Sequence, residues 1–343
     1  MYPDFIGIGA QKAGTTWLYH NLRNHPGIWI PRKEVHYFDQ RIKDADSFSL
    51  RSRVFGKGEA DKKWRNQVRH WTGVHLKNRS LGGLWWVYKF YMRAPGDEWY
   101  ASIFEPRKGR IAGEITPNYS VLDRDMISHA HDLMPDAKII LMTRNPIERA
   151  WSQAVMYFDK IEKQPVETVS VKQFRKFRKN QSSLLTDYLR TLENWGSFFP
   201  EEQIFVGFLE DVHFYPNRLL KRLYKFLGAS SSPEDYKVIK RKVHSRDVET
   251  MPTAVASRLA QTYLEDARRL DETFGGYASF WRYSAERLVE DPPEGKNIAY
   301  PLYNSPLWDE WVAQQGEDPA PGSREADPRS GTLSSLRARS GSG

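Results

Sequence analysis

The chain has 343 residues, enough for one large α/β domain with its own core or for two smaller ones. It contains no cysteine, which excludes disulfides, thiol nucleophiles and cysteine-based metal sites, and which fits a reducing compartment. Its formal net charge of +8 is unevenly placed, because thirteen Lys/Arg stand against four Asp/Glu between residues 41 and 93. This local excess suits an anionic nucleotide or an anionic acceptor, with nucleic acid as the competing interpretation.

The start of the chain leaves little room for a targeting segment. Four residues precede the first expected strand, and no uninterrupted apolar run of ~18 residues follows anywhere. We therefore expect a soluble, cytoplasmic protein without a signal peptide or membrane span.

The first expected unit is a strand at residues 5–9, a glycine-containing loop and a helix. Backbone N–H groups in such a loop, together with the positive end of the helix dipole, bind anions. Gly9 and Gly14 keep the G-x-x-x-x-G spacing of a P-loop, but Thr15 stands where a triphosphatase has lysine. The lysine lies inside the loop, at Lys12. We therefore expect a nucleotide with a single 5′-phosphate that carries a leaving group.

The loop sequence Q-K-A-G-T-T-W resembles the phosphosulfate-binding loop of the sulfotransferase family. In that family the loop holds the 5′-phosphosulfate of 3′-phosphoadenosine 5′-phosphosulfate (PAPS). The resemblance implies that Lys12 is catalytic and stabilises charge on the departing 5′-phosphate. It also implies that the donor is bound by Lys12, Ala13, Gly14, Thr15, Thr16 and Trp17.

A second motif, at residues 32–39, follows a short second strand. It resembles the K-E-x-x-(F/Y)-F segment of carbohydrate-type sulfotransferases, including the heparan sulfate enzymes, in which the glutamate is assigned as general base. An acceptor hydroxyl must lose its proton as it attacks sulfur, and a carboxylate or imidazole can take it. Glu34 is our first candidate and His36 the second. The alternative is a surface ion pair of Glu34 with Lys33 or Arg32.

Residues 40–110 are expected to be the least regular part of the chain. Basic residues alternate there with aromatic ones, which stack on sugar rings and on bases. We interpret this insertion as the acceptor-binding region, with Trp85 and Trp86 as candidates. The alternative is that the rings pack a small helical subdomain.

A third strand, at residues 110–115, leads into a G-E-x-(S/T)-P-x-Y pattern that resembles the same branch of the family. In that branch the pattern faces the acceptor. Glu114 is therefore predicted either to orient the substrate or to hold the loop together. Ile115 stands where many heparan-type members place a lysine, which argues against a heparan-like acceptor.

The clearest buried strand, residues 137–143, runs directly into R-N-P-I-E-R-A-W-S. This resembles the second sulfotransferase signature, in which the arginine and the serine hold the 3′-phosphate. Arg144 and Ser152 are the matching residues. The alternative is that Arg144 caps a helix or pairs with an acid. Arg241 and Lys242 match a basic loop that folds over the donor's phosphates, with a basic surface turn as the alternative.

Together these patterns predict a three-layer α/β/α fold with a central, mostly parallel sheet and a P-loop-like loop. Residues 1–315 are expected to form a single sulfotransferase domain, and residues 316–343 a disordered tail.

The resemblance implies sulfuryl transfer from PAPS to a hydroxyl, or less readily an amine, of a carbohydrate or glycosylated acceptor. No nucleic acid is expected as partner and no metal as cofactor, because the sequence contains no carboxylate cluster suited to Mg²⁺. Three alternatives remain: a P-loop kinase-like phosphotransferase, a sulfotransferase acting on a lipid or small natural product, and a binder of nucleic acid or anionic glycan without catalysis. The sequence leaves the oligomeric state open.

Overall fold

The computed structural model describes residues 1–39, 49–164, 166–169, 171–179, 183–239 and 248–315. Arg241 and Lys242, predicted to bind the donor, lie outside these ranges, and so does the expected tail at residues 316–343.

A five-stranded parallel sheet forms the centre of the fold. Its strands are apolar and largely buried because helices cover both faces, as parallel sheets require. The expected parallel sheet is thus confirmed. In spatial order the strands are β2 (Ile28–Trp29), β3 (Ile111–Ile115), β1 (Phe5–Gly9), β4 (Lys138–Thr143) and β5 (Ile204–Phe208).

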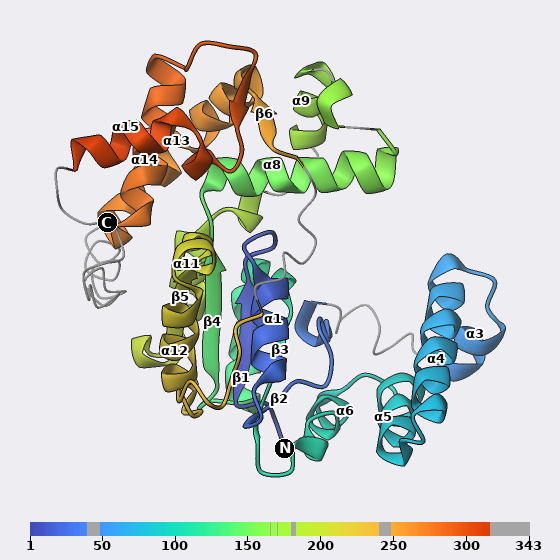
Figure 1. The fold of residues 1–343 in the computed structure, drawn as a ribbon. Coiled ribbons are helices and arrows are strands. Elements are labelled where there is room, and N and C mark those ends of the chain that lie inside the picture. Colours follow the sequence, from blue (N-terminus) through green and yellow to red (C-terminus); the bar gives the residue numbers. More distant parts are fainter. Residues whose placement is uncertain (40–48, 165, 170, 180–182, 240–247, 316–343) are drawn as a thin grey trace.

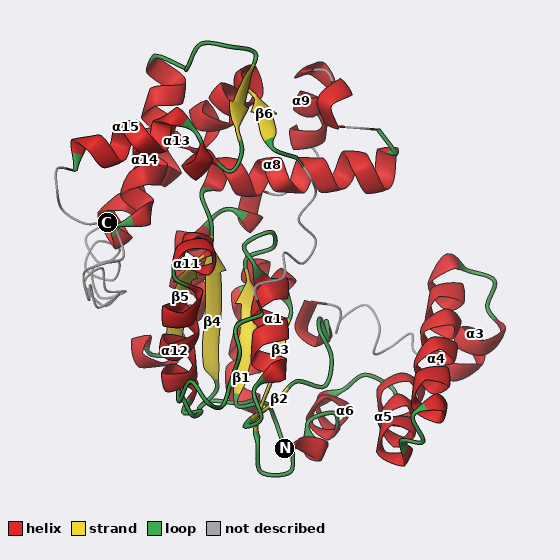
Figure 2. Cartoon of the chain, viewed as in Figure 1, coloured by secondary structure: helices red, strands yellow, loops and turns green. Residues whose placement is uncertain are grey.

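The strand order explains why helices cover both faces of the sheet (Figures 1 and 2). The chain moves from β1 outward to β2, and later from β3 outward in the opposite direction to β4 and β5. Because parallel crossovers are right-handed, opposite directions place the connecting helices on opposite faces. One face carries α1 (Thr15–Asn24) and α12 (Pro216–Leu227), which are joined by a hydrogen bond from the Tyr224 hydroxyl to the Asn21 carbonyl. The other carries α7 (Arg124–Leu133) and α10 (Tyr188–Gly196).

The C-terminal part of the described chain is more helical than its proline content suggests. Its helices pack near α8 (Pro146–Tyr157), which follows β4, and form the upper part of the molecule in Figure 1. Pro306 stands at the start of a helix, where its missing N–H costs nothing. The elements of this part are β6 (Thr250–Pro252), α13 (Thr253–Phe274), α14 (Tyr277–Glu290), β7 (Asn297–Ala299) and α15 (Pro306–Gln314). Two further helices precede it: α9 (Val171–Lys179), and α11 (Leu209–Phe214), which follows β5 and contacts α12.

Residues 50–92 form a helical arm that stands apart from the sheet in Figure 1. The arm consists of α3 (Leu50–Phe55), α4 (Glu59–Lys77) and α5 (Leu81–Met92), and the following α6 (Asp97–Ser102) returns the chain to the main core. The expectation that this region is the least regular of the chain is wrong, and the alternative of a small helical subdomain describes it. The arm has its own small core, formed by Trp86, Val87 and Tyr91.

None of the helices in the described ranges combines the length and the hydrophobicity that crossing a bilayer requires.

Candidate active site

The candidate site lies at the edge of the sheet where the parallel strands end. The loop after β1, the segment after β2 and the start of α8 after β4 all emerge there. Because parallel strands end at the same edge, motifs that are far apart in the sequence meet in space. We call residues 10–16, 33–39 and 144–152 the active edge.

The first loop passes directly into helix α1. Gly14 adopts a φ of 85°, and a Cβ at this position would lie 2.9 Å from Leu209 Cδ1, so the turn requires glycine. Gly14 offers no side chain to cap α1, and the first turn of the helix contains no acidic residue. The N–H groups of this turn and the positive end of the dipole therefore remain for a ligand. The loop fits the phosphate end of a nucleotide.

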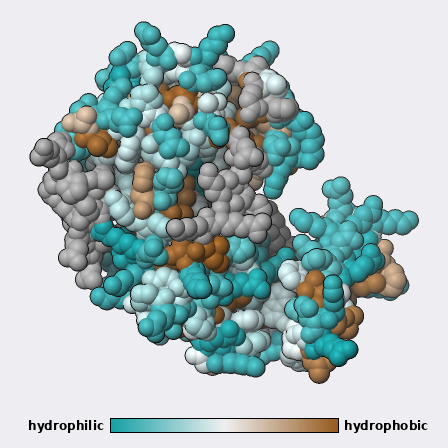
Figure 3. All heavy atoms as spheres, viewed as in Figure 1, coloured by the Kyte–Doolittle hydropathy of each residue, from teal (hydrophilic) through white to brown (hydrophobic). Residues whose placement is uncertain are grey.

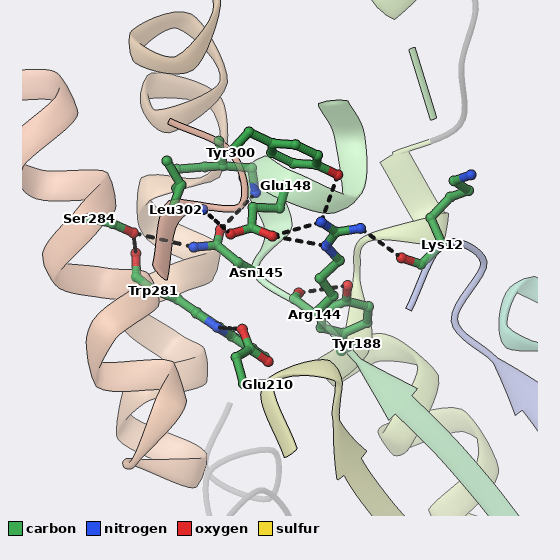
Figure 4. A network of polar contacts seen from close by, with 11 residues as sticks. Lys12, Arg144, Asn145, Glu148, Tyr188, Glu210, Trp281, Ser284, Tyr300 and Leu302 are labelled. Atoms are coloured by element: carbon green, nitrogen blue, oxygen red, sulfur yellow. Dashed lines mark hydrogen bonds and ion pairs between the residues drawn. The ribbon is translucent and has the colours of Figure 1, made fainter. Parts of the chain in front are cut away.

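Lys12 connects this loop to the end of β4 through its backbone. Its carbonyl oxygen accepts a hydrogen bond from Arg144 Nη1 at 3.3 Å. Its side chain points away from Arg144, as Figure 4 shows. The Lys12 ammonium and the Arg144 guanidinium therefore lie in different places and could each contact a different phosphate. This arrangement fits a nucleotide with one phosphate at the 5′ end and another at the 3′ position.

Arg144 is buried and held by several neighbours (Figure 4). Its Nε and Nη2 atoms donate to Glu148 Oε2 at 3.1 and 2.8 Å, one turn along α8. Its carbonyl oxygen accepts from the Tyr188 hydroxyl at 2.9 Å, and Glu148 Oε1 accepts from the N–H of Leu302 at 2.8 Å. The acid partner considered as an alternative is thus present, and it fixes the orientation of the guanidinium. Phosphate binding by Arg144 stays a prediction.

The Tyr300 hydroxyl joins the two residues predicted to hold the 3′-phosphate. It accepts a hydrogen bond from Arg144 Nη2 at 2.7 Å and is also hydrogen-bonded to Ser152. Arg144 and Ser152 therefore converge on one oxygen atom, as they would on an oxygen of a shared phosphate. Sequence reasoning missed Tyr300, because it lies 156 residues from Arg144 and belongs to no recognisable motif.

Glu34 and His36 project from a strained stretch of backbone. Their φ angles are 62° and 59°, a region that costs non-glycine residues of order 1–3 kcal/mol and persists only where neighbours impose it. The neighbours here belong to the end of β3: Glu34 N donates to the Ile115 carbonyl at 3.0 Å, and Val35 N donates to Thr116 Oγ1 at 3.0 Å. As a result His36 Nε2 lies 3.7 Å from Glu34 Oε2.

Glu114 is fully buried directly beneath this backbone. Its carboxylate accepts hydrogen bonds from the hydroxyls of Tyr100, Thr116 and Tyr119 at 2.7, 2.6 and 3.1 Å, and from Val35 N at 3.2 Å. Burial raises the pKa of the carboxyl, and these donors oppose the rise. The geometry favours the prediction that Glu114 holds the loop together, and it leaves no exposed oxygen of Glu114 for an acceptor.

Lys33 joins the first loop to the candidate base. Its Nζ donates to Thr16 Oγ1 at 2.6 Å and lies 3.2 Å from Glu34 Oε1. The surface ion pair considered as an alternative for Glu34 therefore exists, but its lysine also reaches the phosphate-binding loop. Sequence reasoning treated Lys33 only as that ion-pair partner. Its backbone pairs with Ile115, the position where many heparan-type enzymes place a lysine.

The pKa of Glu34 is lowered and the pKa of His36 is raised. A hydrogen bond with His36 lowers the pKa of Glu34 to about 2. Burial lowers the pKa of His36, but hydrogen bonds to Asp39 and Glu34 outweigh it and raise the pKa to about 9. Near neutral pH His36 is therefore protonated and Glu34 is ionised, so Glu34 is the member of the pair that can accept a proton. Asp39, which orients His36, is a further residue that sequence reasoning did not assign.

The remaining predicted site residues are either buried beside the first loop or located on the helical arm. Ala13 and Trp17 are buried in the main core, and Thr15 is buried at the start of α1. Trp86 belongs to the core of the helical arm, whereas Trp85 is exposed on the arm. The structure does not bring these two tryptophans to the active edge, and their contact with an acceptor stays a prediction.

Comparison with protein families agrees with this geometry. Residues 3–233 match the profile described as "Sulfotransferase family", which covers the loop, the active edge and the whole parallel sheet. The chain belongs to the sulfotransferase family. Within this sulfotransferase, the matched range also includes the helical arm.

Two of three curated relatives of this sulfotransferase have names that mention a sugar. Mouse "Heparan sulfate glucosamine 3-O-sulfotransferase 3B1" is 27% identical over 239 residues, which are 66% of this chain and 46% of the relative. Human "Carbohydrate sulfotransferase 15" is 23% identical over 284 residues, 70% of this chain and 46% of the relative. "Membrane-associated sulfotransferase kil1" of Dictyostelium discoideum is 27% identical over 155 residues, 44% of this chain and 22% of the relative. The chain thus spans less than half the length of these three proteins.

A solved structure supports the fold. The sulfotransferase from Alicyclobacillus acidocaldarius superposes with a TM-score of 0.54 at 23% identity, and the match covers 82% of this chain and 99% of that one. At this identity the likeness concerns the fold alone.

Proposed function

We propose that this sulfotransferase transfers the sulfuryl group of PAPS to a hydroxyl of a carbohydrate-containing acceptor. The observation that carries the proposal is the position of Lys33, whose ammonium group contacts both Thr16 of the phosphate-binding loop and the Glu34 carboxylate. The contact supports the proposal, because Glu34, the proposed proton acceptor, then lies beside the loop proposed to bind the 5′-phosphosulfate, as transfer to a hydroxyl requires.

The residues of the active edge suit the two ends of the donor. The uncapped amides of α1 and the Lys12 ammonium would hold the 5′-phosphosulfate, and Arg144 with Ser152 would hold the 3′-phosphate. Thr15 and Thr16 add hydroxyls beside the loop. Arg241 and Lys242 complete the proposed set from outside the described residues. When bound, PAPS supplies the sulfuryl group and a leaving group. The leaving group is the 5′-phosphate of 3′-phosphoadenosine 5′-phosphate (PAP), the product that remains after transfer.

Each polar residue of the active edge has a distinct role in the proposal. Glu34 takes the proton of the acceptor hydroxyl as the hydroxyl oxygen attacks, and His36, protonated and held by Asp39, keeps the Glu34 carboxylate in place. Lys12 and Lys33 stabilise the negative charge that develops at the leaving 5′-phosphate. These interactions are strongest when charge has moved to the leaving group, so they lower the barrier rather than merely bind substrate.

A carbohydrate acceptor is supported by the names of the relatives, which include glucosamine 3-O-sulfotransferases. The 3-O position in the names of the heparan sulfate enzymes favours a hydroxyl over an amine. Ile115 stands where many heparan-type enzymes carry a lysine, so we propose a sugar acceptor other than heparan sulfate.

The domain that carries out the reaction, its metal requirement and its location in the cell are three further points. We propose that residues 1–315 act as one sulfotransferase domain, that transfer proceeds without a metal ion, and that it takes place in the cytoplasm. Addition of EDTA tests the second point, because a rate that falls would contradict it, and cell fractionation tests the third.

The experiment is transfer of radiolabelled sulfate from PAPS to a panel of acceptors: oligosaccharides with free or acetylated amines, a glycolipid, a small phenol and a peptide. We expect label on the oligosaccharides through a hydroxyl, and retention of label when the amine is acetylated. Label only on the phenol or the peptide would refute the carbohydrate acceptor. Absence of transfer to every acceptor, with tight binding of Mg²⁺-ATP in place of PAP, would refute sulfuryl transfer itself.

A further inference from the structure

The helical arm carries a positive charge as large as that of the whole chain. Residues 50–92 contain ten Lys/Arg and two Asp/Glu, a net charge of +8, and the complete sequence also has a formal net charge of +8. Most of these cations are exposed on α4 and at its ends. Within the part of the chain that the structure describes, Lys62, Lys63 and Lys77 form no ion pair. The arm is therefore the main source of a positive field on this molecule.

The arm also exposes large apolar side chains. Seven of the ten exposed large hydrophobic residues in the described ranges belong to it. Three of them surround the turn from α4 to α5: Leu76, Leu81 and Trp85 are 59%, 82% and 57% exposed. Figure 3 shows hydrophobic side chains gathered on the lower part of the arm. Large exposed apolar side chains that gather in one place indicate an interaction site, whereas single exposed ones are ordinary surface composition.

The sequence of α5 explains this exposure. Lys89 is the only charged residue among its twelve, so the helix is apolar on all sides, a pattern expected of a buried helix. One face, with Trp86 and Val87, packs against α4, and Gly83 allows close approach, because a Cβ there would meet the His75 ring. The opposite face, with Leu81 and Trp85 one turn apart, has no such covering.

The turn between α4 and α5 combines both properties in one place. Lys77 and Arg79 are exposed there, directly between Leu76 and Leu81 in the sequence. Leucine and tryptophan side chains beside lysine and arginine are the composition of segments that insert into the interface of an anionic bilayer. Tryptophan in particular is favoured at the level of the lipid headgroups.

We propose that this turn, residues 76–85, docks the sulfotransferase on a membrane surface that contains anionic phospholipid. Leu76, Leu81 and Trp85 enter the interface, and Lys77 and Arg79 contact the headgroup phosphates. The rest of the arm's charge attracts the protein to the surface. An anionic bilayer fits better than a second copy of this chain, because two arms of charge +8 repel each other. It also fits better than a nucleic acid or an anionic glycan, because these can stack on Trp85 but gain little from the exposed aliphatic side chains of Leu76 and Leu81.

The base of the arm is anchored next to the active edge. Arg32 donates to the Tyr91 hydroxyl at 2.9 Å, and its guanidinium lies 4.7 Å from the centre of the Phe90 ring. Arg32 precedes Lys33 and Glu34 directly, so a docked arm holds the segment that carries the proposed base near the membrane. Docking itself does not depend on the proposed reaction.

The test is co-sedimentation of the full chain with vesicles of phosphatidylcholine alone and of phosphatidylcholine mixed with phosphatidylglycerol. We expect binding to the mixed vesicles that weakens as salt is added, and much weaker binding to phosphatidylcholine alone. The double variant Leu81→Ser/Trp85→Ser should bind the mixed vesicles at least about tenfold more weakly. Lys77→Glu/Arg79→Glu should bind more weakly as well and lose part of the salt dependence.

Matched controls keep the result specific to the turn. Ile161→Ser removes an apolar residue that is equally exposed outside the arm, and Lys221→Glu reverses an exposed charge on α12; both should bind vesicles as the unchanged chain does. Because Leu81 and Trp85 are exposed, their replacement should leave the melting temperature and PAP binding unchanged.

Three outcomes would overturn the proposal. The first is vesicle binding that Leu81→Ser/Trp85→Ser leaves intact. The second is binding to heparin or to an oligonucleotide that competes with vesicles and is insensitive to the same double variant, which would assign the arm to a polyanion. The third is a dimer, formed without lipid and abolished by that variant, which would assign the apolar surface to a second copy of the chain.

Discussion

The active edge and the helical arm use positive charge in opposite ways. At the active edge, Arg144 is buried against Glu148, and Lys33 is held between Thr16 and Glu34. On the arm, cations such as Lys62 are exposed on helices without a buried residue of their own. Charges held by neighbours are oriented before a ligand arrives, as recognition of a phosphate at a defined position requires. Exposed charges on long side chains suit a broad, deformable anionic surface instead.

The two regions also differ in how they are built. The active edge is attached to a sheet whose strands are buried on both faces, so its loops are fixed by the main core. The arm is held by a separate core of three buried residues. Changes at the active edge are therefore expected to affect chemistry strongly, whereas changes in the arm should affect it weakly.

The largest effect is expected at Lys12. Lys12→Ala removes a cation from the site where negative charge develops, which should lower the rate of sulfate transfer by about 10²–10³-fold. The matched control is Lys62→Ala on α4, which should leave transfer to a water-soluble acceptor unchanged. Steady-state rates with radiolabelled PAPS give both values. Full activity in Lys12→Ala would remove this residue from the mechanism.

A smaller effect is expected at Arg144. Arg144→Lys retains the charge but loses the planar group that reaches Glu148 and Tyr300 together, so PAP should bind about 10–100-fold more weakly. Calorimetry with PAP measures the change. Tyr283→Phe, which removes a tyrosine hydroxyl on α14, serves as control and should bind PAP normally. Equal affinity of Arg144→Lys and the unchanged chain would mean that Arg144 is only structural.

A third prediction concerns the charge state of His36 at the active edge. NMR titration should give a pKa of about 9 for His36, and Asp39→Asn should lower that pKa by about one unit or more. Since the pKa is raised above the ordinary 6.5, the ion pair stabilises the fold fully below pH 6.5, and this stabilisation is lost as pH rises through about 9. A pKa near 6.5 in both proteins would show that His36 is neutral at physiological pH.

The smallest effect on the active edge is expected from the arm. Trp86→Ala removes the largest buried side chain of the arm's core, at a local cost of about 3–5 kcal/mol. Hydrogen exchange should accelerate in α4 and α5, while β1 and β4 stay protected and PAP affinity changes by less than about twofold. Trp195→Ala in the main core should lower the melting temperature of the whole protein instead. Weakened PAP binding in Trp86→Ala would mean that the arm and the edge are coupled.

The sequence was most informative where local pattern and tertiary structure agree. The apolar run before Arg144 became β4, the run before the first loop became β1, and Gly14 lies at the left-handed turn that the loop requires. Such features depend on residues that are close in sequence, and burial of parallel strands on both faces makes them recognisable. The parallel sheet could therefore be predicted before any coordinates were known.

Contacts between distant segments could not be predicted in this way. Tyr300 reaches Arg144 across 156 residues, and the four donors that surround Glu114 come from three separate segments. The arm was misread for a different reason: its basic and aromatic composition suggested an irregular insertion, although α4 and α5 pack against each other through their aromatic residues. Composition described the surface of this region correctly and its secondary structure wrongly.

The central claim is that Glu34 accepts the proton of the acceptor at a PAPS site. Glu34→Gln keeps the size and shape of the side chain and removes its basicity, so one sample serves both for calorimetry with PAP and for transfer of radiolabelled sulfate. We predict PAP binding within about twofold of the unchanged chain, together with a loss of turnover of about 10²-fold or more. Turnover close to normal, or PAP binding lost together with turnover, would contradict the assignment of Glu34 as the base.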